Sequence, residues 1–183
     1  MKDVDRQHTC CFFGHRKINK TDTLKAAVYK AVEDLIVEKS VTTFLFGSKS
    51  RFDDLCYKIV SELKDRYPNI KRIYVRAEYP YISDDYKEYL LQFYEETYYP
   101  ERMIDAGKAA YVERNYEMVD KSNFSIVYYD VDYLPPRRKN SRRDLTDYQP
   151  KSGTKIAYDY AIKKCGRVIN VFLEKSCCWS DEK

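Results

Sequence analysis

The chain has 183 residues, 44% of them hydrophobic and 34% charged, which is typical of a globular protein with one domain and its own core. A formal net charge of +4 is too small to indicate nucleic-acid binding by itself, and the six cysteines lack the CxxC spacing of a zinc site. No signal peptide or apolar run of membrane-spanning length is visible. We therefore predict a cytoplasmic protein with no membrane partner, metal site or cofactor.

The first part of the chain alternates buried strands with amphipathic helices. An unbroken apolar run within residues 8–13 is typical of a strand that is covered on both faces. Helix-start residues at 19–22 precede apolar residues at helical spacing, and this helix should end near Lys39. A second buried strand is predicted at 41–46, and Pro68 ends the helix that follows it.

The same alternation continues to the last strand. In order, we predict a strand at 70–77, helices at 83–96 and 106–121, a strand at 124–129, a long polar loop at 130–150, a helix to Lys164 and a strand at 167–173. This pattern indicates an α/β fold: a single Rossmann-like three-layer domain over residues 1–173, with a polar tail at 174–183. Its five-stranded, mainly parallel sheet should have the strand order 3-2-1-4-5.

In that order, strands 1 and 4 are neighbours at the topological switch point, where ligands bind beyond the carboxyl ends of the strands. Three loops should meet there, namely 14–17, 47–50 and 130–154. The third loop ends in the small-residue turn 152–154, which opens a helix, and free N–H groups at such a start can bind an anion. Five cations precede this turn: Arg137, Arg138, Lys139, Arg142 and Arg143. We interpret this stretch as a nucleotide-phosphate site; an ordinary helix cap is the alternative for the turn taken alone.

Four groups of residues resemble motifs of the SLOG superfamily, which is named for the SMF/DprA and LOG proteins. These are Cys10-Cys11-Phe12-Phe13-Gly14-His15-Arg16; Leu45-Phe46-Gly47-Ser48 with Phe52-Asp53; Glu113-Arg114-Asn115 with Met118-Val119-Asp120; and Ser152-Gly153-Thr154 with Ala157. They occur in the right order over nearly the whole chain, and the chain most resembles the small bacterial YpsA-like branch. The resemblance implies a Rossmann-like fold that binds nucleotides or nucleotide-derived ligands such as ADP-ribose-like molecules.

The resemblance also implies a set of ligand-binding residues. Gly14, His15 and Arg16 would line the crevice, and Gly47, Ser48 and Asp53 would form its neighbouring wall. Arg114 and Asn115 would come from the helix before strand 4, and Ser152, Gly153 and Thr154 would take a phosphate. Beyond the resemblance, we expect Arg16 and cations such as Arg138 to clamp this phosphate. Simpler roles exist for three of them: His15 as a turn cap, Asp53 as a helix-start acid and Arg114 as a solvated helix charge.

Two departures from the family pattern bear on activity. LOG enzymes, which cleave the N-glycosidic bond of nucleoside monophosphates, end their motif in Gly-Thr-x-x-Glu, and here the Glu position is Ala157. The loop at 47–53 also lacks the usual paired glycines. Because such hydrolysis needs a carboxylate, we expect no catalytic residue at this position.

We therefore expect a non-catalytic nucleotide-binding sensor, in which binding orders the loop at 130–150 and signals to a protein partner or a second copy. One alternative is an N-glycosidic hydrolase that takes its carboxylate from Asp53, Glu78, Glu113 or Asp132. A third hypothesis is single-stranded nucleic-acid binding through 137–143 with tyrosine stacking.

Overall fold

The computed structural model describes residues 5–78, 82–103, 106–135 and 152–172. Its centre is a six-stranded sheet in the order β4-β3-β2-β1-β5-β6, and all neighbouring strands are parallel. The strands are β1 (Thr9–Gly14), β2 (Thr43–Phe46), β3 (Lys71–Val75), β4 (Glu96–Tyr98), β5 (Phe124–Tyr128) and β6 (Arg167–Asn170). The predicted α/β fold, its parallel sheet and the relative order of the five expected strands are confirmed.

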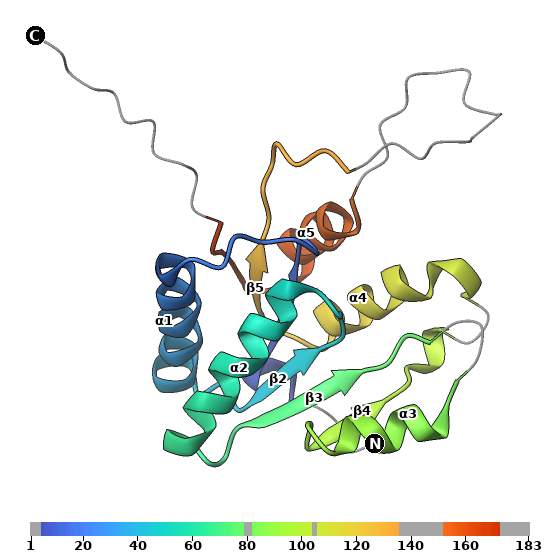
Figure 1. Ribbon diagram of the computed structural model, residues 1–183, viewed down its shortest axis with the longest axis horizontal. Coiled ribbons are helices and arrows are strands. Elements are labelled where there is room, and N and C mark those ends of the chain that lie inside the picture. The colour runs from blue at the N-terminus through green and yellow to red at the C-terminus, as the bar shows by residue number, and fades with distance from the viewer. Residues whose placement is uncertain (1–4, 79–81, 104–105, 136–151, 173–183) are drawn as a thin grey trace, which may run out of the picture.

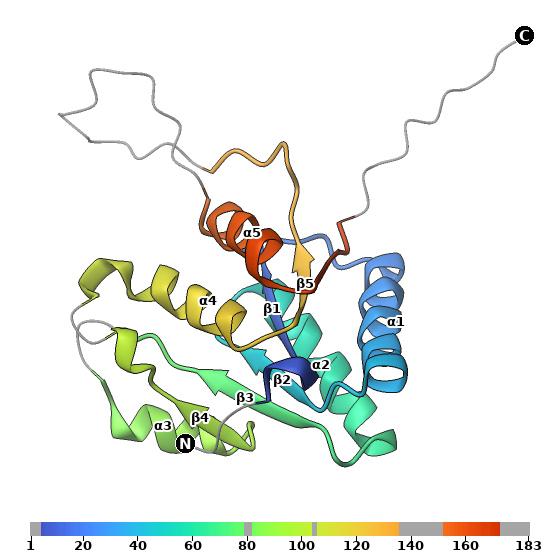
Figure 2. The same cartoon turned by 180° about the vertical axis from the view of Figure 1, so that it is seen from behind.

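Helices cover both faces of the sheet, as Figures 1 and 2 show. They are α1 (Asp22–Lys39), α2 (Arg51–Arg66) and α3 (Asp84–Leu91) on one side, and α4 (Ala110–Asp120) and α5 (Gly153–Lys164) on the other. Successive side chains of a strand point to opposite faces. Cys10 and Phe12 therefore pack with α1 and α2, whereas Cys11 and Phe13 pack with α4 and α5.

Side-chain caps begin the helices that lead away from the sheet edge. The hydroxyl of Thr21 accepts a hydrogen bond from an amide of α1, and Ser50 and Ser152 do the same for α2 and α5. Each cap satisfies a backbone donor that has no partner inside the helix. The start of α5 at 152–154 is thus a true helix N-terminus, as the sequence predicted. The helix expected from residue 106 begins with the short 3-10 turn Gly107–Ala109, and its α-helical part starts at Ala110.

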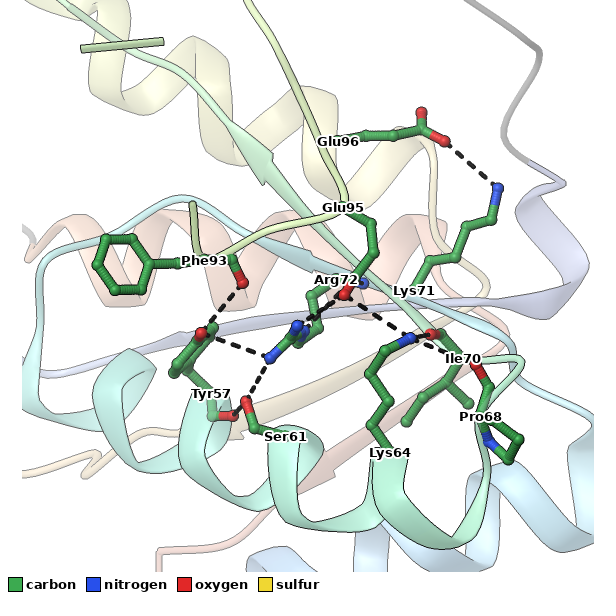
Figure 3. A network of polar contacts seen from close by, with 10 residues as sticks. All are labelled: Tyr57, Ser61, Lys64, Pro68, Ile70, Lys71, Arg72, Phe93, Glu95 and Glu96. Atoms are coloured by element: carbon green, nitrogen blue, oxygen red, sulfur yellow. Dashed lines mark hydrogen bonds and ion pairs between the residues drawn. The ribbon is translucent and has the colours of Figure 1, made fainter. Parts of the chain in front are cut away.

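The predicted helix at 83–96 is wrong in its second half. Helix α3 ends at Leu91, and Glu96–Tyr98 pair in parallel with β3 as a sixth strand at the edge of the sheet. Figure 3 shows a polar network that turns the chain onto β3. The guanidinium of Arg72 donates to Glu95 (Nη2–Oε1 2.6 Å) and to the hydroxyl of Ser61 (2.7 Å). These contacts join residues that are distant in the sequence, so helical spacing alone gave no sign of them.

We expect Arg72→Met to lower the free energy of unfolding by roughly 1.5–3 kcal/mol, because Glu95 loses a charged partner at a partly buried position. Urea unfolding at neutral pH measures the change. The matched control is Lys71→Met on the same strand, which removes a more exposed ion pair with Glu96 and should change stability by about 1 kcal/mol or less. Equal losses in the two variants would contradict the role of Arg72 in holding β4.

Candidate functional site

The loops after β1 and β2 meet at the carboxyl edge of the sheet. The amide of Arg51, the first residue of α2, donates to the carbonyl of Arg16 at 3.2 Å. Phe52 packs so closely on Gly14 that a Cβ atom there would lie 2.7 Å from the Phe52 ring. Because glycine has no Cβ atom, Gly14 allows the start of α2 to approach β1 closely. The predicted crevice residues Gly14 and Arg16 thus lie beside the start of α2.

Asp53 is the buried acid of this edge, with 3% of its surface exposed. Its Oδ2 accepts hydrogen bonds from the amides of Ser48 (2.6 Å) and Gly47 (3.4 Å) and so holds the loop after β2. Its Oδ1 has no hydrogen-bond partner within the described ranges. Burial raises the pKa of Asp53 to about 7, although the charge of Arg114 and the two amides lower it. Asp53 is therefore more than a helix-start acid.

Arg114 comes from α4 and lies over the loop after β2. It is 6% exposed, and a Cβ atom on Gly47 would lie 2.5 Å from its Cδ. Its Nε donates to Oδ1 of Asn115 at 3.0 Å. Burial lowers the pKa of Arg114, and the negative charge of Asp53 opposes this shift. Arg114 is thus not a solvated helix charge, and the structure brings it together with Gly47 and Asp53 from three separate segments.

His15 is buried and positions the residues that follow β5. Its Nε2 accepts a hydrogen bond from the amide of Asp130 at 3.0 Å, so the neutral ring carries its proton on Nδ1. Burial lowers the pKa of His15, which favours this neutral form. Its ring packs against Tyr133, with centroids 4.2 Å apart. His15 therefore joins the loop after β1 to the first residues of the loop after β5, a role close to the predicted turn cap.

The start of α5 reaches the same loop. Ser152 caps the helix through a hydrogen bond from the amide of Lys155 (3.1 Å), and a Cβ atom on Gly153 would meet nothing within 4 Å. The ammonium of Lys155 donates to the hydroxyl of Tyr129 at 3.4 Å, and the Tyr129 ring lies 5.9 Å from His15 between centroids. The turn with Thr154 is therefore linked to the loop after β5. Arg138 and the other cations of 137–143 lie outside the described residues.

A further group of polar residues at this edge joins Glu78, one of the candidate carboxylates, to Arg76, which had not been identified from the sequence. Arg76 directly follows β3, is 4% exposed and pairs with Glu78 (Nη2–Oε2 2.8 Å). Burial raises the pKa of Glu78, but hydrogen bonds from Arg76 and the amide of Ser83 outweigh it and lower the pKa overall. Lys49 lies 4.7 Å above the Tyr86 ring. A charged residue at the carboxyl end of a buried strand, such as Arg76, is the signal that would have pointed to this group.

The four carboxylates considered for catalysis lie in different surroundings. Glu78 pairs with Arg76, and Glu113 pairs with Arg102 at 3.1 Å. Asp132 is exposed beyond β5, whereas Asp53 combines burial with an oxygen that has no hydrogen-bond partner in the described chain. Among the four, Asp53 is therefore best suited to proton transfer.

Comparisons with known proteins do not assign a family. No protein-family model matches the chain, and no curated protein matches it either. Within residues 5–78, 82–103, 106–135 and 152–172, no group of three or more His, Cys, Asp or Glu residues is arranged to hold a metal ion. In the same ranges, no helix has the length and apolar character needed to cross a bilayer.

Proposed function

We propose that this chain is a SLOG-type nucleotide-binding module, which takes an ADP-ribose-like ligand at the carboxyl edge of its sheet. The observation that carries the proposal is the contact of three loops and two capped helix starts around the neighbouring strands β1 and β5. In open α/β sheets this switch point is where ligands bind. Gly14 lets Phe52 pack closely on β1 there, and Gly47 lets Arg114 pack closely on the loop after β2.

The two helix starts differ in charge, and this difference suggests how the ligand lies. The first turn of α5 contains no acid, and Gly153 leaves open space beside it, so this start suits a phosphate. The first turn of α2 contains Asp53 and Asp54, which would repel a phosphate but suit the hydroxyl groups of a ribose. We therefore place the phosphate at 152–154 and the nucleoside toward 47–53.

A thermal-shift screen tests the proposal with AMP, ADP, ATP, NAD, ADP-ribose, cyclic nucleotides and short single-stranded DNA. A ligand at ~100 times its Kd adds about 2.7 kcal/mol to the free energy of unfolding, which gives a clear shift. We expect a nucleotide to stabilise the protein and to be recovered intact. Stabilisation by DNA alone, or by no compound, would overturn the proposal.

The variant Thr154→Glu locates the phosphate. It places a negative charge at the second residue of α5, which favours the helix but repels an anion. The matched control is Thr23→Glu, at the second residue of the capped helix α1. We expect at least about tenfold weaker nucleotide binding in the first variant and unchanged binding in the second. Equal affinities would show that the phosphate does not lie at α5.

A hydrolase remains the second candidate, and the state of Asp53 favours it. A buried carboxyl with a pKa of about 7 and an oxygen without a hydrogen-bond partner in the described chain is suited to general acid or base work. Against it, Ala157 is fully buried in the core between α5 and the sheet, where the LOG enzymes carry their Glu. Chromatography of AMP and ADP-ribose after incubation distinguishes the two candidates. Release of base by the wild type and not by Asp53→Asn would make the protein an enzyme.

A further inference from the structure

A second polar cluster lies between β1, β5 and the C-terminal end of α5. The hydroxyl oxygen of Ser125 lies 3.1 Å from the sulfur of Cys11 and 3.0 Å from the sulfur of Cys165. Cys11 and Ser125 are register partners in the sheet, and Cys165 directly follows the last residue of α5. The start of α5 lies at the proposed ligand site, so this cluster is at the other end of the helix. Two thiols from distant parts of the sequence thus share one hydroxyl neighbour.

The two thiols have unequal surroundings. Cys11 is fully buried, whereas Cys165 is only partly buried. Hydrogen bonds from Cys11 and Ser125 lower the pKa of Cys165, against the effect of burial. Arg6 lowers it further and Asp120 opposes this, whereas burial raises the pKa of Cys11. Cys165 is therefore the thiol of the pair that peroxide oxidises first, because a thiolate is a stronger nucleophile than a thiol.

We propose that Cys165 and Cys11 form a peroxide-reactive site, in which Cys165 is oxidised first and Cys11 then closes an intramolecular disulfide. A partly exposed reactive cysteine beside a second thiol is the usual arrangement of such sites. The inference does not depend on the ligand proposed above.

The reaction needs only hydrogen peroxide as oxidant. The Cys165 thiolate attacks one peroxide oxygen and the O–O bond breaks, giving a sulfenic acid and hydroxide, which takes up a proton to become water. The Cys11 sulfur then attacks the Cys165 sulfur, the S–O bond breaks, and the departing hydroxide leaves as water with the Cys11 proton. Two thiols are oxidised to one disulfide, and one peroxide is reduced to two waters. The Ser125 hydroxyl must rotate aside so that the sulfurs meet.

Peptide mapping of the full chain tests the proposal. The reduced protein is treated with one equivalent of hydrogen peroxide near neutral pH, blocked with N-ethylmaleimide and digested with trypsin. We expect a disulfide between the peptides 7–16 and 165–167, which dithiothreitol reverses. We also expect Cys165 to react at least about tenfold faster than the buried Cys56. Linkage of Cys165 to the peptide with Cys177 and Cys178, or a Cys165 that stays reduced, would overturn the proposal.

Cys10 supplies the matched control because it lies in the same tryptic peptide but faces the opposite core, with α1 and α2. We expect Cys10→Ser to keep the disulfide and Cys165→Ser to lose it. In Cys11→Ser, the Cys165 sulfenic acid should persist and be trapped by dimedone. Loss of the linkage in folded Cys10→Ser would assign the second thiol to Cys10 and contradict the proposal. The wild-type linkage remains a test even where a core variant fails to fold.

Discussion

Gly47→Ala is expected to lower the free energy of unfolding by roughly 1–3 kcal/mol, because the added methyl group overpacks a closed site. Its Cβ would lie 2.5 Å from Cδ of Arg114 and 2.8 Å from the sulfur of Met118, so both side chains must shift. Arg114 would then leave its present position over the loop after β2, and the nucleotide affinity should fall together with the stability. Urea unfolding and ligand titration of the purified variant measure the two effects.

Gly153→Ala is the matched control at the other side of the proposed site. A Cβ atom there meets nothing within 4 Å, and the residue begins α5 without a positive φ. We expect it to be neutral or to stabilise the protein by up to about 1 kcal/mol, since alanine lowers the entropy of the unfolded chain. A Gly47→Ala variant as stable as Gly153→Ala would show that Arg114 does not depend on the close approach to Gly47.

Asp53→Asn is expected to change how stability depends on pH. The pKa of Asp53 is about 7 in the folded protein and near the ordinary value of 3.8 in the unfolded chain. Between these values the folded protein keeps a proton that the unfolded chain has released, so wild-type stability falls as the pH rises. The variant has no such proton. Its stability relative to the wild type should therefore increase by roughly 2–3 kcal/mol from about pH 5 to about pH 8.

Unfolding in urea at several pH values measures this difference, and the slope carries the prediction rather than the stability at one pH. Asp54→Asn removes an exposed acid from the same turn of α2 and controls for the loss of charge at the helix start. A stability difference between Asp53→Asn and wild type that stays constant over the range would contradict a raised pKa. Such a result would also contradict the suggestion that Asp53 acts as a general acid or base.

Much of the architecture follows from short stretches of sequence. The apolar runs around Phe12 and Phe44 predicted two central strands, and the capping residues Thr21 and Ser152 predicted helix starts. The alternation of these elements, with the rules for parallel crossovers, led to the order of the five expected strands. The strand Glu96–Tyr98 was not predicted, because it is only partly buried and its position beside β3 depends on the contact between Arg72 and Glu95, which are distant in the sequence.

The candidate site was also predicted only in part from the sequence. Gly47, Asp53 and Arg114 were named from motif resemblance, and the loop after the second strand was assigned to this edge of the sheet from the predicted fold. Their burial, the hydrogen bonds of Asp53 and its pKa of about 7 depend on α4 packing over the loop after β2. The local sequence does not predict how deeply a carboxyl group is buried, and burial is what raises its pKa.

The sequence by itself determined the fold class, the starts of α1 and α5 and the sheet edge at which the loops after β1, β2 and β5 lie, because these depend on periodicity, capping and chain direction. Only the tertiary structure decided that Glu96–Tyr98 extend the sheet, that Asp53 is buried within the electrostatic influence of Arg114 and that Cys11 and Cys165 flank Ser125. Each of these features depends on side chains that come from distant segments of the chain. For Asp53 and the two cysteines, burial and neighbouring groups also shift the pKa.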